Sequence, residues 1–407
     1  MSEHMSADAV VLGVDLGGTQ IRAAAILPTG ERLGRRSVAT PLAGGPEAIY
    51  AGCADLLRGV IADLPGGVRD RLVAIGISSM GPVDPWRGVI VDPPNVVALR
   101  DAPLADEIEA RLGLPTYLER DTNVAALAEH WLGAARGCHD FLYVTVSTGL
   151  GGAIWRDGHL MLGPDGTAGE IGHISLIPGG GPRCGCGSAG HLEAIASGSG
   201  LATAAQDALA AMARGQLATA IWGEPGAGDR VEPGAGDRVE PGAGDRVEPA
   251  AGDRVEPAAC RTRDGWPASA ASGESSFLAA RAEDGALTGR DVAEGELAGD
   301  EVCIWLMERA RRAFAIACVG WVNAFNPERI VVGGTVAERQ GERWLEPARA
   351  AVSATGLRCP AERVRIVPAE LGHDVGLAGA WPLVDERHGV PAWRERRVKA
   401  QGVRPPG

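Results

Sequence analysis

Four strong metal ligands lie close together near the middle of this 407-residue chain: His173, Cys184, Cys186 and His191. Thiolate and imidazole donors together favour a tetrahedral zinc ion, and four protein ligands leave no open position for water. Glycines at positions 179, 180, 181, 185, 187 and 190 allow the backbone to fold tightly around an ion. The spacing therefore predicts a structural zinc site, in preference to unrelated surface residues or a strained Cys184–Cys186 disulfide.

Two carboxylates flank this metal loop. Glu170 stands shortly before His173, and Glu193 stands shortly after His191. A carboxylate can accept hydrogen bonds from neighbouring sugar hydroxyls, so both residues are candidates for binding a sugar; the alternative for each is a solvated surface acid. His173 is a third candidate, because one ring nitrogen can bind zinc while the other faces a ligand.

Three glycine-rich turns follow apolar runs typical of strands. A strand and not a helix follows the first turn, and Gly-Lys-Ser/Thr is absent from it, which excludes a dinucleotide fingerprint and a P-loop. Backbone N–H groups in such turns can still hold phosphates, helped by the Thr19 hydroxyl, and Asp15 can hold magnesium through water. The turns predict a nucleotide site formed by Asp15, Gly17, Gly18, Thr19, Thr148, Gly149, Gly151, Gly333 and Gly334, with Gly372–Gly376 as a candidate fourth turn.

Asp121 stands where a short strand ends and an alanine-rich helix begins. An aspartate at this place can be an N-cap worth about 1 kcal/mol. It can also be a catalytic base, because a helix N-terminus favours the ionised carboxylate. In phosphoryl transfer the base mainly orients the attacking hydroxyl and takes its proton late, so a carboxylate of ordinary basicity is sufficient.

Apolar periodicity places these residues at the ends of regular elements. Strands are predicted over 10–15, 21–27, 32–39, 73–79, 116–118, 141–147, 153–156, 330–332 and 364–367. Helices are predicted over 46–64, 104–112, 122–132, 300–325 and 375–383. The strand–glycine turn–strand unit of 10–27 recurs at 141–156, which indicates two similar domains that face each other.

Composition narrows the class of protein. A net charge of −13 disfavours a nucleic-acid binder, and no apolar stretch has the length of a membrane span. The first residues do not read as a signal peptide, and the eight cysteines include only one close pair. We therefore expect a reduced, cytoplasmic protein that binds neither nucleic acid nor membranes.

Residues from about 223 to 257 repeat an octapeptide, Pro-Gly-Ala-Gly-Asp-Arg-Val-Glu, that begins at Pro225, Pro233, Pro241 and, with alanine in place of the first glycine, Pro249. Each copy has a single branched apolar residue, too little to offset the entropy of ordering the chain. The sequence predicts a disordered insertion that extends to about residue 285, in preference to a solenoid or a calcium-binding repeat.

Together these motifs resemble the ROK family of sugar kinases and sugar-responsive repressors. The resemblance covers nearly the whole chain outside the octapeptides and the tails. It rests on Asp15–Gln20, Gly81–Asp84, Glu119–Glu129, Ser147–Gly152, Gly169–His173, Cys184–Glu193 and Asn326–Gly334. It implies an α/β fold of the two-domain actin/hexokinase-like type, with RNase H-like halves that close an interdomain cleft over ATP and a sugar.

The resemblance also implies how the domains divide. A disordered N-terminus covers 1–8, and the N-terminal RNase H-like domain covers 9–121. The C-terminal domain covers 122–374 and contains the zinc loop 173–191 and the insertion of about 223–285. A helix of about 375–390 packs back on the first domain.

The activity implied is ATP- and magnesium-dependent phosphorylation of a hexose at its 6-hydroxyl, most simply of glucose, by a homodimer or higher homo-oligomer. Asp121 matches the family's base, and the substrate-binding positions are Asn95, Arg120, Asp121, Glu170, His173 and Glu193. Arg120 stands where the family often has an asparagine that touches the sugar. His191 stands where the family usually has a third zinc cysteine.

Two alternatives remain open at this point. The substrate of the kinase can be another hexose or an N-acetylhexosamine, such as fructose, mannose or N-acetylmannosamine. The chain can also be a non-catalytic, sugar-responsive regulator. Such regulators carry a helix-turn-helix domain ahead of the kinase-like fold, and we expect none here because the first glycine turn begins at Asp15.

Overall fold

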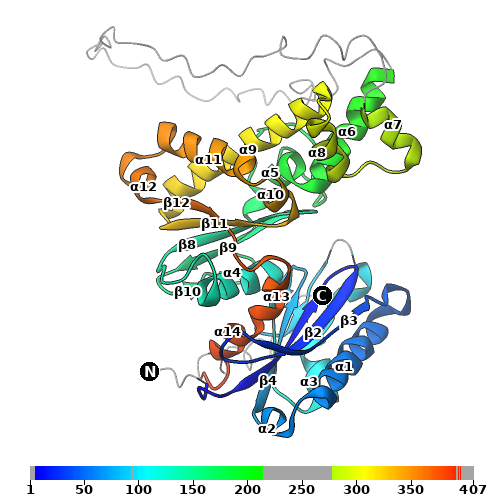
Figure 1. Ribbon diagram of the computed structural model, residues 1–407, viewed down its shortest axis with the longest axis vertical. Coiled ribbons are helices and arrows are strands. Elements are labelled where there is room, and N and C mark those ends of the chain that lie inside the picture. Colours follow the sequence, from blue (N-terminus) through cyan, green and yellow to red (C-terminus); the bar gives the residue numbers. More distant parts are fainter. Residues whose placement is uncertain (1–4, 94–95, 214–276, 391–392, 394, 396–407) are drawn as a thin grey trace, which may run out of the picture.

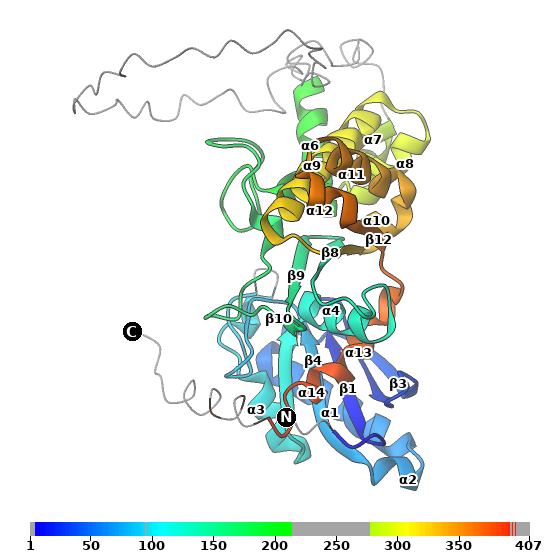
Figure 2. The ribbon, with the colours of Figure 1, turned by 90° about the vertical axis from the view of Figure 1, so that its left-hand side faces the viewer.

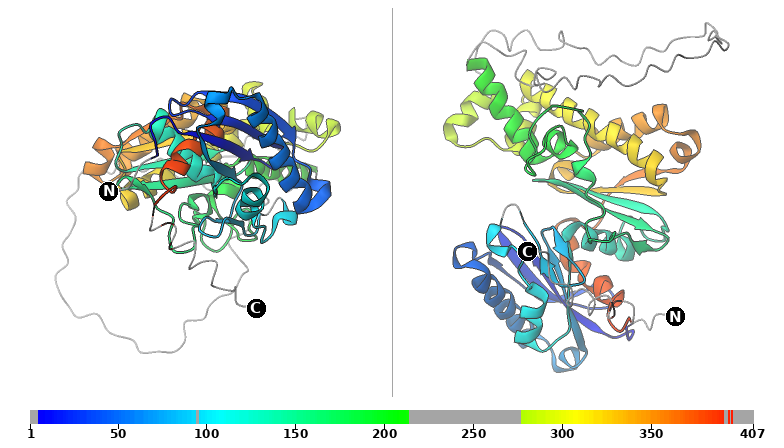
Figure 3. Two further views of the ribbon diagram at one scale, coloured as in Figure 1. Left: turned by 90° about the horizontal axis from the view of Figure 1, so that it is seen from below. Right: turned by 180° about the vertical axis from the view of Figure 1, so that it is seen from behind.

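The computed structural model describes residues 5–93, 96–213, 277–390, 393 and 395 (Figure 1). Asn95 and the octapeptide repeats lie outside these residues. The chain forms two domains stacked along the long axis, each built on a five-stranded sheet. The view from behind shows the same two-lobed arrangement (Figure 3).

The two sheets repeat one topology. The N-terminal sheet has the order β3-β2-β1-β4-β7 and the C-terminal sheet the order β10-β9-β8-β11-β12. In each sheet the central strand pairs antiparallel with the strand that follows it and parallel with its other neighbour. The strands are β1 (Val10–Leu16), β2 (Gln20–Ile26), β3 (Arg32–Ala39), β4 (Leu72–Ser79), β7 (Thr116–Arg120), β8 (Phe141–Val146), β9 (Leu150–Arg156), β10 (His159–Leu160), β11 (Arg329–Gly333) and β12 (Arg365–Pro368), with a small ribbon of β5 (Val83–Asp84) and β6 (Val89–Ile90). The duplication predicted from the glycine turns is thus a duplication of whole sheets.

Helices cover both sheets and fill the layer between them. The N-terminal domain has α1 (Gly45–Asp63), α2 (Gly66–Arg69) and α3 (Leu104–Leu112). The C-terminal domain has α5 (Leu192–Ala196), α6 (Gly198–Ala213), α7 (Phe277–Asp284), α8 (Gly289–Leu297), α9 (Glu301–Phe325), α10 (Thr335–Gln340), α11 (Glu342–Thr355) and α12 (Arg358–Arg363). Between the sheets lie α4 (Asp121–Leu132), α13 (Val375–Ala378) and α14 (Ala380–Asp385) (Figure 1).

Alternating side chains divide the core into layers. On β8, Leu142 and Val144 pack with the helices of the C-terminal domain, whereas Phe141 and Tyr143 pack into the layer between the sheets. Successive residues of a strand point to opposite faces, so a strand buried on both faces needs an unbroken apolar run. The central strands β1 and β8 both have such runs.

The middle layer joins the two domains. Helix α4 contacts β8 and β9 on one side and α13 and α14 on the other, and α14 packs on β1 and β4. The residues of α4 share one apolar cluster with both sheets. The predicted domain boundary between residues 121 and 122 assigns α4 to the C-terminal domain, although α4 packs against both domains.

The predicted disorder up to about residue 285 is wrong for its last part. Residues 277–284 form α7, which packs on α6 and α8 with Leu278 fully buried. Unlike the octapeptides, this segment carries helix-forming residues and an apolar side chain that a neighbouring helix can cover.

Among the residues that the structure describes, none of the helices combines the length and the apolar character needed to cross a membrane.

The contact of β4 with α14 gives a stability test. A Cβ at Gly76 would lie 2.7 Å from the carbonyl oxygen of Ala380, whereas a Cβ at Gly320 in α9 meets no described atom. Gly76→Ala should destabilise the protein by about 1–3 kcal/mol, because backbone must shift. Gly320→Ala, its control, should stabilise by about 0.5–1 kcal/mol. Urea unfolding measures both, and equal stability of the two variants would contradict this packing.

Candidate functional site

The predicted functional residues gather where strands of the two sheets end. Asp15 lies near the end of β1, and Asp121 follows directly after β7. The second and third glycine turns follow β8 and β11 of the other sheet. Ligands in open α/β folds bind at the carboxyl ends of the strands, so both sheets present their binding edges to this region.

Asp121 is the first residue of α4, and its Oδ1 accepts a hydrogen bond from the N–H of Thr122 at 2.7 Å. The residue is exposed to solvent, but the protein groups packed around its carboxylate remove part of its hydration. This desolvation raises the pKa of Asp121 to about 6; Arg120 opposes the rise, and Asp15 and Glu170 add to it. The helix N-terminus, which favours the ionised carboxylate, therefore does not fully offset the loss of hydration at Asp121.

Asp15 is nearly buried, and its Oδ2 accepts a hydrogen bond from Arg22 of β2. Burial raises the pKa of Asp15, and the Arg22 guanidinium counteracts that rise. Gly376 of α13 comes so close that a Cβ there would lie 2.8 Å from the Asp15 carboxyl carbon. The fourth glycine-rich segment thus lies beside the first.

Arg120 is the last residue of β7 and only 5% exposed. Its guanidinium donates to the carboxylate of Glu170 and to two backbone carbonyls, those of Gly152 at 3.0 Å and Ala168 at 2.8 Å. All three partners belong to the C-terminal domain. The side chain predicted to touch substrate is thus engaged with protein groups.

The four predicted metal ligands come together in the loop between β10 and α5. Figure 2 shows this loop projecting from one side of the C-terminal domain. The ligand atoms of His173, Cys184, Cys186 and His191 all lie within 4.8 Å of one another. The two histidine Nδ1 atoms are 3.3 Å apart, and the Cys184 and Cys186 sulfurs lie 3.6 Å and 3.3 Å from the nearer Nδ1.

This geometry fits a zinc ion. Bonds of about 2.0–2.1 Å to nitrogen and about 2.3 Å to sulfur separate tetrahedral ligands by roughly 3.3–3.8 Å. Both cysteines are free thiols, as the sequence predicted. Burial raises the pKa of the Cys184 thiol to about 12, so a bound cation must displace its proton.

The two flanking carboxylates lie in different surroundings. Glu170 is exposed, and its second oxygen lies 3.6 Å from Nε2 of His173, the nitrogen opposite the metal-facing one. Glu193 is tied to protein groups: it accepts a hydrogen bond from the N–H of Leu150 at 2.9 Å and from the Cys184 thiol at 3.4 Å. Glu193 thus connects the metal loop to the second glycine turn.

The second and third glycine turns touch each other. The Ser147 hydroxyl lies 3.0 Å from the Thr335 hydroxyl, and a Cβ at Gly334 would lie 2.5 Å from the carbonyl oxygen of Val146. Gly334 also has a φ of 91°, so both the close approach and the backbone conformation require glycine at this position. The first turn, with Gly17, Gly18 and an exposed Thr19, belongs to the other domain.

Sequence reasoning missed a buried carboxylate network behind Asp121. Glu119 is fully buried and accepts hydrogen bonds from the Arg120 backbone N–H at 2.8 Å and from Asn123 at 2.9 Å. Its other oxygen accepts from Arg387. Glu119 and Asn123 stand in the same motif as Asp121, which was the available signal; Arg387 had none.

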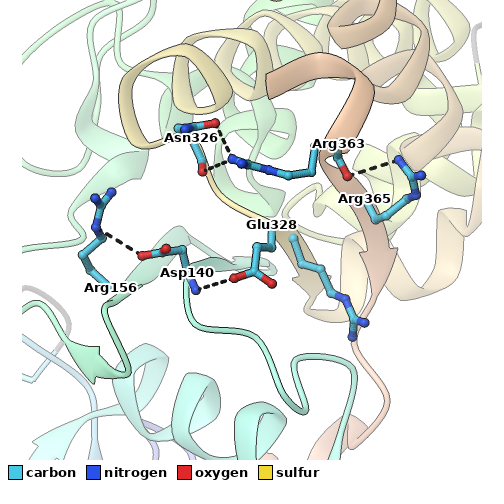
Figure 4. A pocket seen from close by; sticks show the side chains of 7 residues that line it. Asp140, Arg156, Asn326, Glu328, Arg363 and Arg365 are labelled. Carbon is cyan, nitrogen blue, oxygen red and sulfur yellow. Dashed lines mark hydrogen bonds and ion pairs between the residues drawn. The ribbon is translucent and has the colours of Figure 1, made fainter. Parts of the chain in front are cut away.

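A cavity of about 450 Å³ lies at the opposite, amino-terminal edge of the C-terminal sheet (Figure 4). Its guanidinium groups do not converge: Arg363 reaches Asn326, at the end of α9, and Arg365 folds back onto the carbonyls of α12 and Val364. Helix C-termini favour such cations. The lining therefore caps helices, and the cavity lies apart from the residues above.

The metal fit is tested by elemental analysis. The purified protein should contain about one zinc per chain, because all four ligand positions are filled by protein. Cys184→Ser should lose most of this metal and lower the thermal unfolding temperature. Cys359→Ser, an exposed free cysteine outside the cluster, should keep both. Wild-type protein without bound metal, at unchanged stability, would refute the site.

Comparison with known proteins agrees with this arrangement. A model of the ROK family matches residues 11–232 and 253–387. A glucokinase of Halalkalibacterium halodurans is 29% identical over 376 residues, which cover 92% of this chain and 95% of the relative. An N-acetylmannosamine kinase of Escherichia fergusonii is 38% identical over 195 residues, which cover 48% of this chain and 64% of that protein.

A solved structure extends the comparison to the fold. A ROK family glucokinase from Streptomyces griseus, in complex with glucose and AMPPNP, superposes with a TM-score of 0.64 at 27% identity. The match covers 92% of this chain and 99% of that one. The predicted actin/hexokinase-like fold is thereby confirmed.

Proposed function

Because this chain belongs to the ROK family, we propose that it is an ATP-dependent hexose kinase that phosphorylates the 6-hydroxyl of glucose. One observation carries the proposal. The Asp121 carboxylate, at the first residue of the helix between the two sheets, has a raised pKa and lies within electrostatic reach of Glu170 of the other domain and of Asp15. The full-length similarity to a glucokinase supports glucose as the substrate.

In the proposed reaction Asp121 is the base. Its carboxylate accepts a hydrogen bond from the sugar hydroxyl, orients that oxygen toward the γ-phosphate and takes the proton as the new O–P bond forms. The bond from the γ-phosphorus to the bridging oxygen breaks, and ADP leaves. A pKa of about 6 keeps Asp121 ionised at pH 7 yet basic enough to hold the proton that it receives.

The glycine turns of both domains are proposed to hold ATP. The backbone N–H groups of Gly18 and Thr19 would face it from the N-terminal domain, where the N–H of Gly17 closes the turn on the Gln20 carbonyl at 3.0 Å. The backbone at Thr148, Gly149, Gly151, Gly333 and Gly334 would face it from the other domain. Magnesium, when bound, neutralises charge on the phosphates. Arg22 takes only one oxygen of Asp15, so the other can accept from a water on that ion.

The sugar is proposed to lie between Asp121 and the metal loop. Glu170 and His173 would receive its hydroxyls, Glu193 would hold the loop to the second glycine turn, and Asn95 remains a further proposed contact. The zinc ion would be structural: it fixes His173 through Nδ1 and leaves Nε2 to face the sugar and Glu170.

Two rivals are separated by one assay. The N-acetylmannosamine kinase relative supports an N-acetylhexosamine as the second candidate substrate. ADP release measured with glucose, fructose, mannose, N-acetylmannosamine and N-acetylglucosamine ranks the sugars by kcat/KM. Release with none of them, together with tight sugar binding, would favour the non-catalytic regulator.

Asp121→Asn tests the base. Turnover with glucose should fall about a hundredfold to ten-thousandfold, whereas glucose affinity should change little. The raised pKa makes the ionised carboxylate unfavourable in the folded protein above about pH 6, so the unfolding temperature at pH 8 should not fall. Asp55→Asn, an exposed pair with Arg58 on α1, is the control and should behave as wild type. Near-normal kcat in Asp121→Asn would contradict the assignment.

The pH profile is a separate test. A base must be ionised, so kcat/KM for glucose at saturating ATP should rise with pH through about 6 and level off above it. An aspartate of ordinary pKa would put this limb near 3.9. Sugars do not titrate in this range, whereas a terminal phosphate does, with a second pKa of about 6. Any limb that persists in the residual activity of Asp121→Asn is therefore assigned to ATP, and a limb lost in that variant is assigned to Asp121. A kcat/KM for glucose that stays constant from about pH 4.5 to about pH 8 would exclude the raised pKa.

A further inference from the structure

The Arg120 side chain crosses from one domain to the other. It stands at the end of β7, directly before Asp121, yet its Glu170, Gly152 and Ala168 partners all belong to the C-terminal domain. Within the part of the chain that the structure describes, its guanidinium makes one further hydrogen bond, a long one of 3.4 Å to Oδ1 of Asn123 in α4. The guanidinium therefore ties the loop that leads into the metal site to the end of β7, directly before the proposed base.

Two glycines make room for this crossing. A Cβ at Gly81 would lie 2.9 Å from Cδ of Arg120, and one at Gly169 would lie 2.8 Å from its Nη2. Gly169 also has a φ of 97°, which other residues rarely adopt. The slot is thus shaped around an extended arginine.

Stability alone is a poor explanation for this arginine. Its Nε is buried and has no hydrogen-bond partner among the described residues, which costs free energy. Burying a guanidinium against a single carboxylate gains little net stability, because desolvation offsets the attraction. The Arg120–Glu170 pair instead fixes the distance between the end of β7 and the segment that leads into the metal loop.

The contacts continue from Glu170 to the metal ligands. One oxygen of Glu170 meets Arg120, and the other lies 3.6 Å from Nε2 of His173. An unbroken series of side chains thus runs from the residue before Asp121 to the metal cluster.

We propose that Arg120 is a positioning residue that holds Glu170, and through it the sugar-binding edge of the metal loop, at a fixed place beside Asp121. This inference rests on the proposed function. It replaces a direct contact of Arg120 with the sugar by an action through Glu170. Because the contact joins the two domains, it also limits how far they can separate at the site.

The charge of Arg120 has a second, separable effect. The groups that face Asp121 are Arg120, Asp15 of β1, Glu170 of the metal loop and the Thr122 N–H; Tyr143 of β8 lies near it and stays neutral. Arg120 lowers the pKa of Asp121 against the effect of burial. Removing that charge should raise the pKa of Asp121 and move the acid limb of kcat/KM to higher pH.

The test compares Arg120→Gln with Arg120→Lys and Glu170→Gln. In Arg120→Gln, glucose affinity measured by calorimetry should weaken roughly tenfold to a hundredfold, as for loss of a charged hydrogen bond, and the acid limb should move up. Arg120→Lys keeps the positive charge but lacks the planar set of N–H donors. The acid limb of kcat/KM should therefore stay at its wild-type pH, whereas glucose affinity should remain weakened. Arg58→Gln, an exposed arginine on α1, is the matched control and should change neither.

A double-variant cycle isolates the action through Glu170. Arg120→Gln with Glu170→Gln should bind glucose no worse than the weaker single variant, because the two residues act as one unit. The proposal would be overturned if the double variant lost glucose affinity by the product of the two single-variant factors, or if the glucose Kd of Arg120→Gln were unchanged. If Arg120→Gln does not fold, the same cycle is run with Arg120→Lys. Wild-type protein that binds glucose but releases no ADP would contradict the proposed function and not this role.

Discussion

Helix α4 can lie between the two sheets only because its neighbours let the backbones approach closely. A Cβ at Gly379, between α13 and α14, would lie 2.1 Å from the carbonyl oxygen of Val124. The fully buried Glu129 carboxylate accepts the N–H groups of Ala134, Glu370 and Leu371, which ties the end of α4 to the chain that leaves β12. Both domains therefore hold the helix in place, and the helix in turn fixes the position of its first residue, Asp121.

The proposed chemistry follows from this placement. Asp121 is exposed, but the protein groups around its carboxylate remove part of its hydration, which raises its pKa. In the proposed reaction it needs a partner from the facing domain to complete the substrate site. The Arg120–Glu170 contact supplies that connection, and a metal ion held by the Cys/His cluster would stiffen the loop on the far side. We therefore propose that Asp121, the Glu170 side of the loop and the metal cluster are held in fixed positions relative to one another.

Local patterns made much of this predictable. The metal ligands are close in sequence, and the strand–turn–strand units repeat, so spacing alone indicated the cluster and the duplicated fold. Helix α11, with Pro347 inside it, has a pattern that argues against a helix, yet burial of Trp344 and Leu345 overrides it. The contact of Glu119 with Arg387 joins residues 268 positions apart, and the pKa of Asp121 responds to charges as distant in the sequence as Asp15 and Glu170. Such long-range effects leave no local signal in a sequence.

The most direct test is a crystal structure of the protein with glucose and a non-hydrolysable ATP analogue. We expect the 6-hydroxyl oxygen to lie about 2.6–3.2 Å from the Asp121 carboxylate, on the line to the γ-phosphate, with Arg120 still paired to Glu170. Glucose bound away from the metal loop, or Asp121 turned from the hydroxyl, would contradict it.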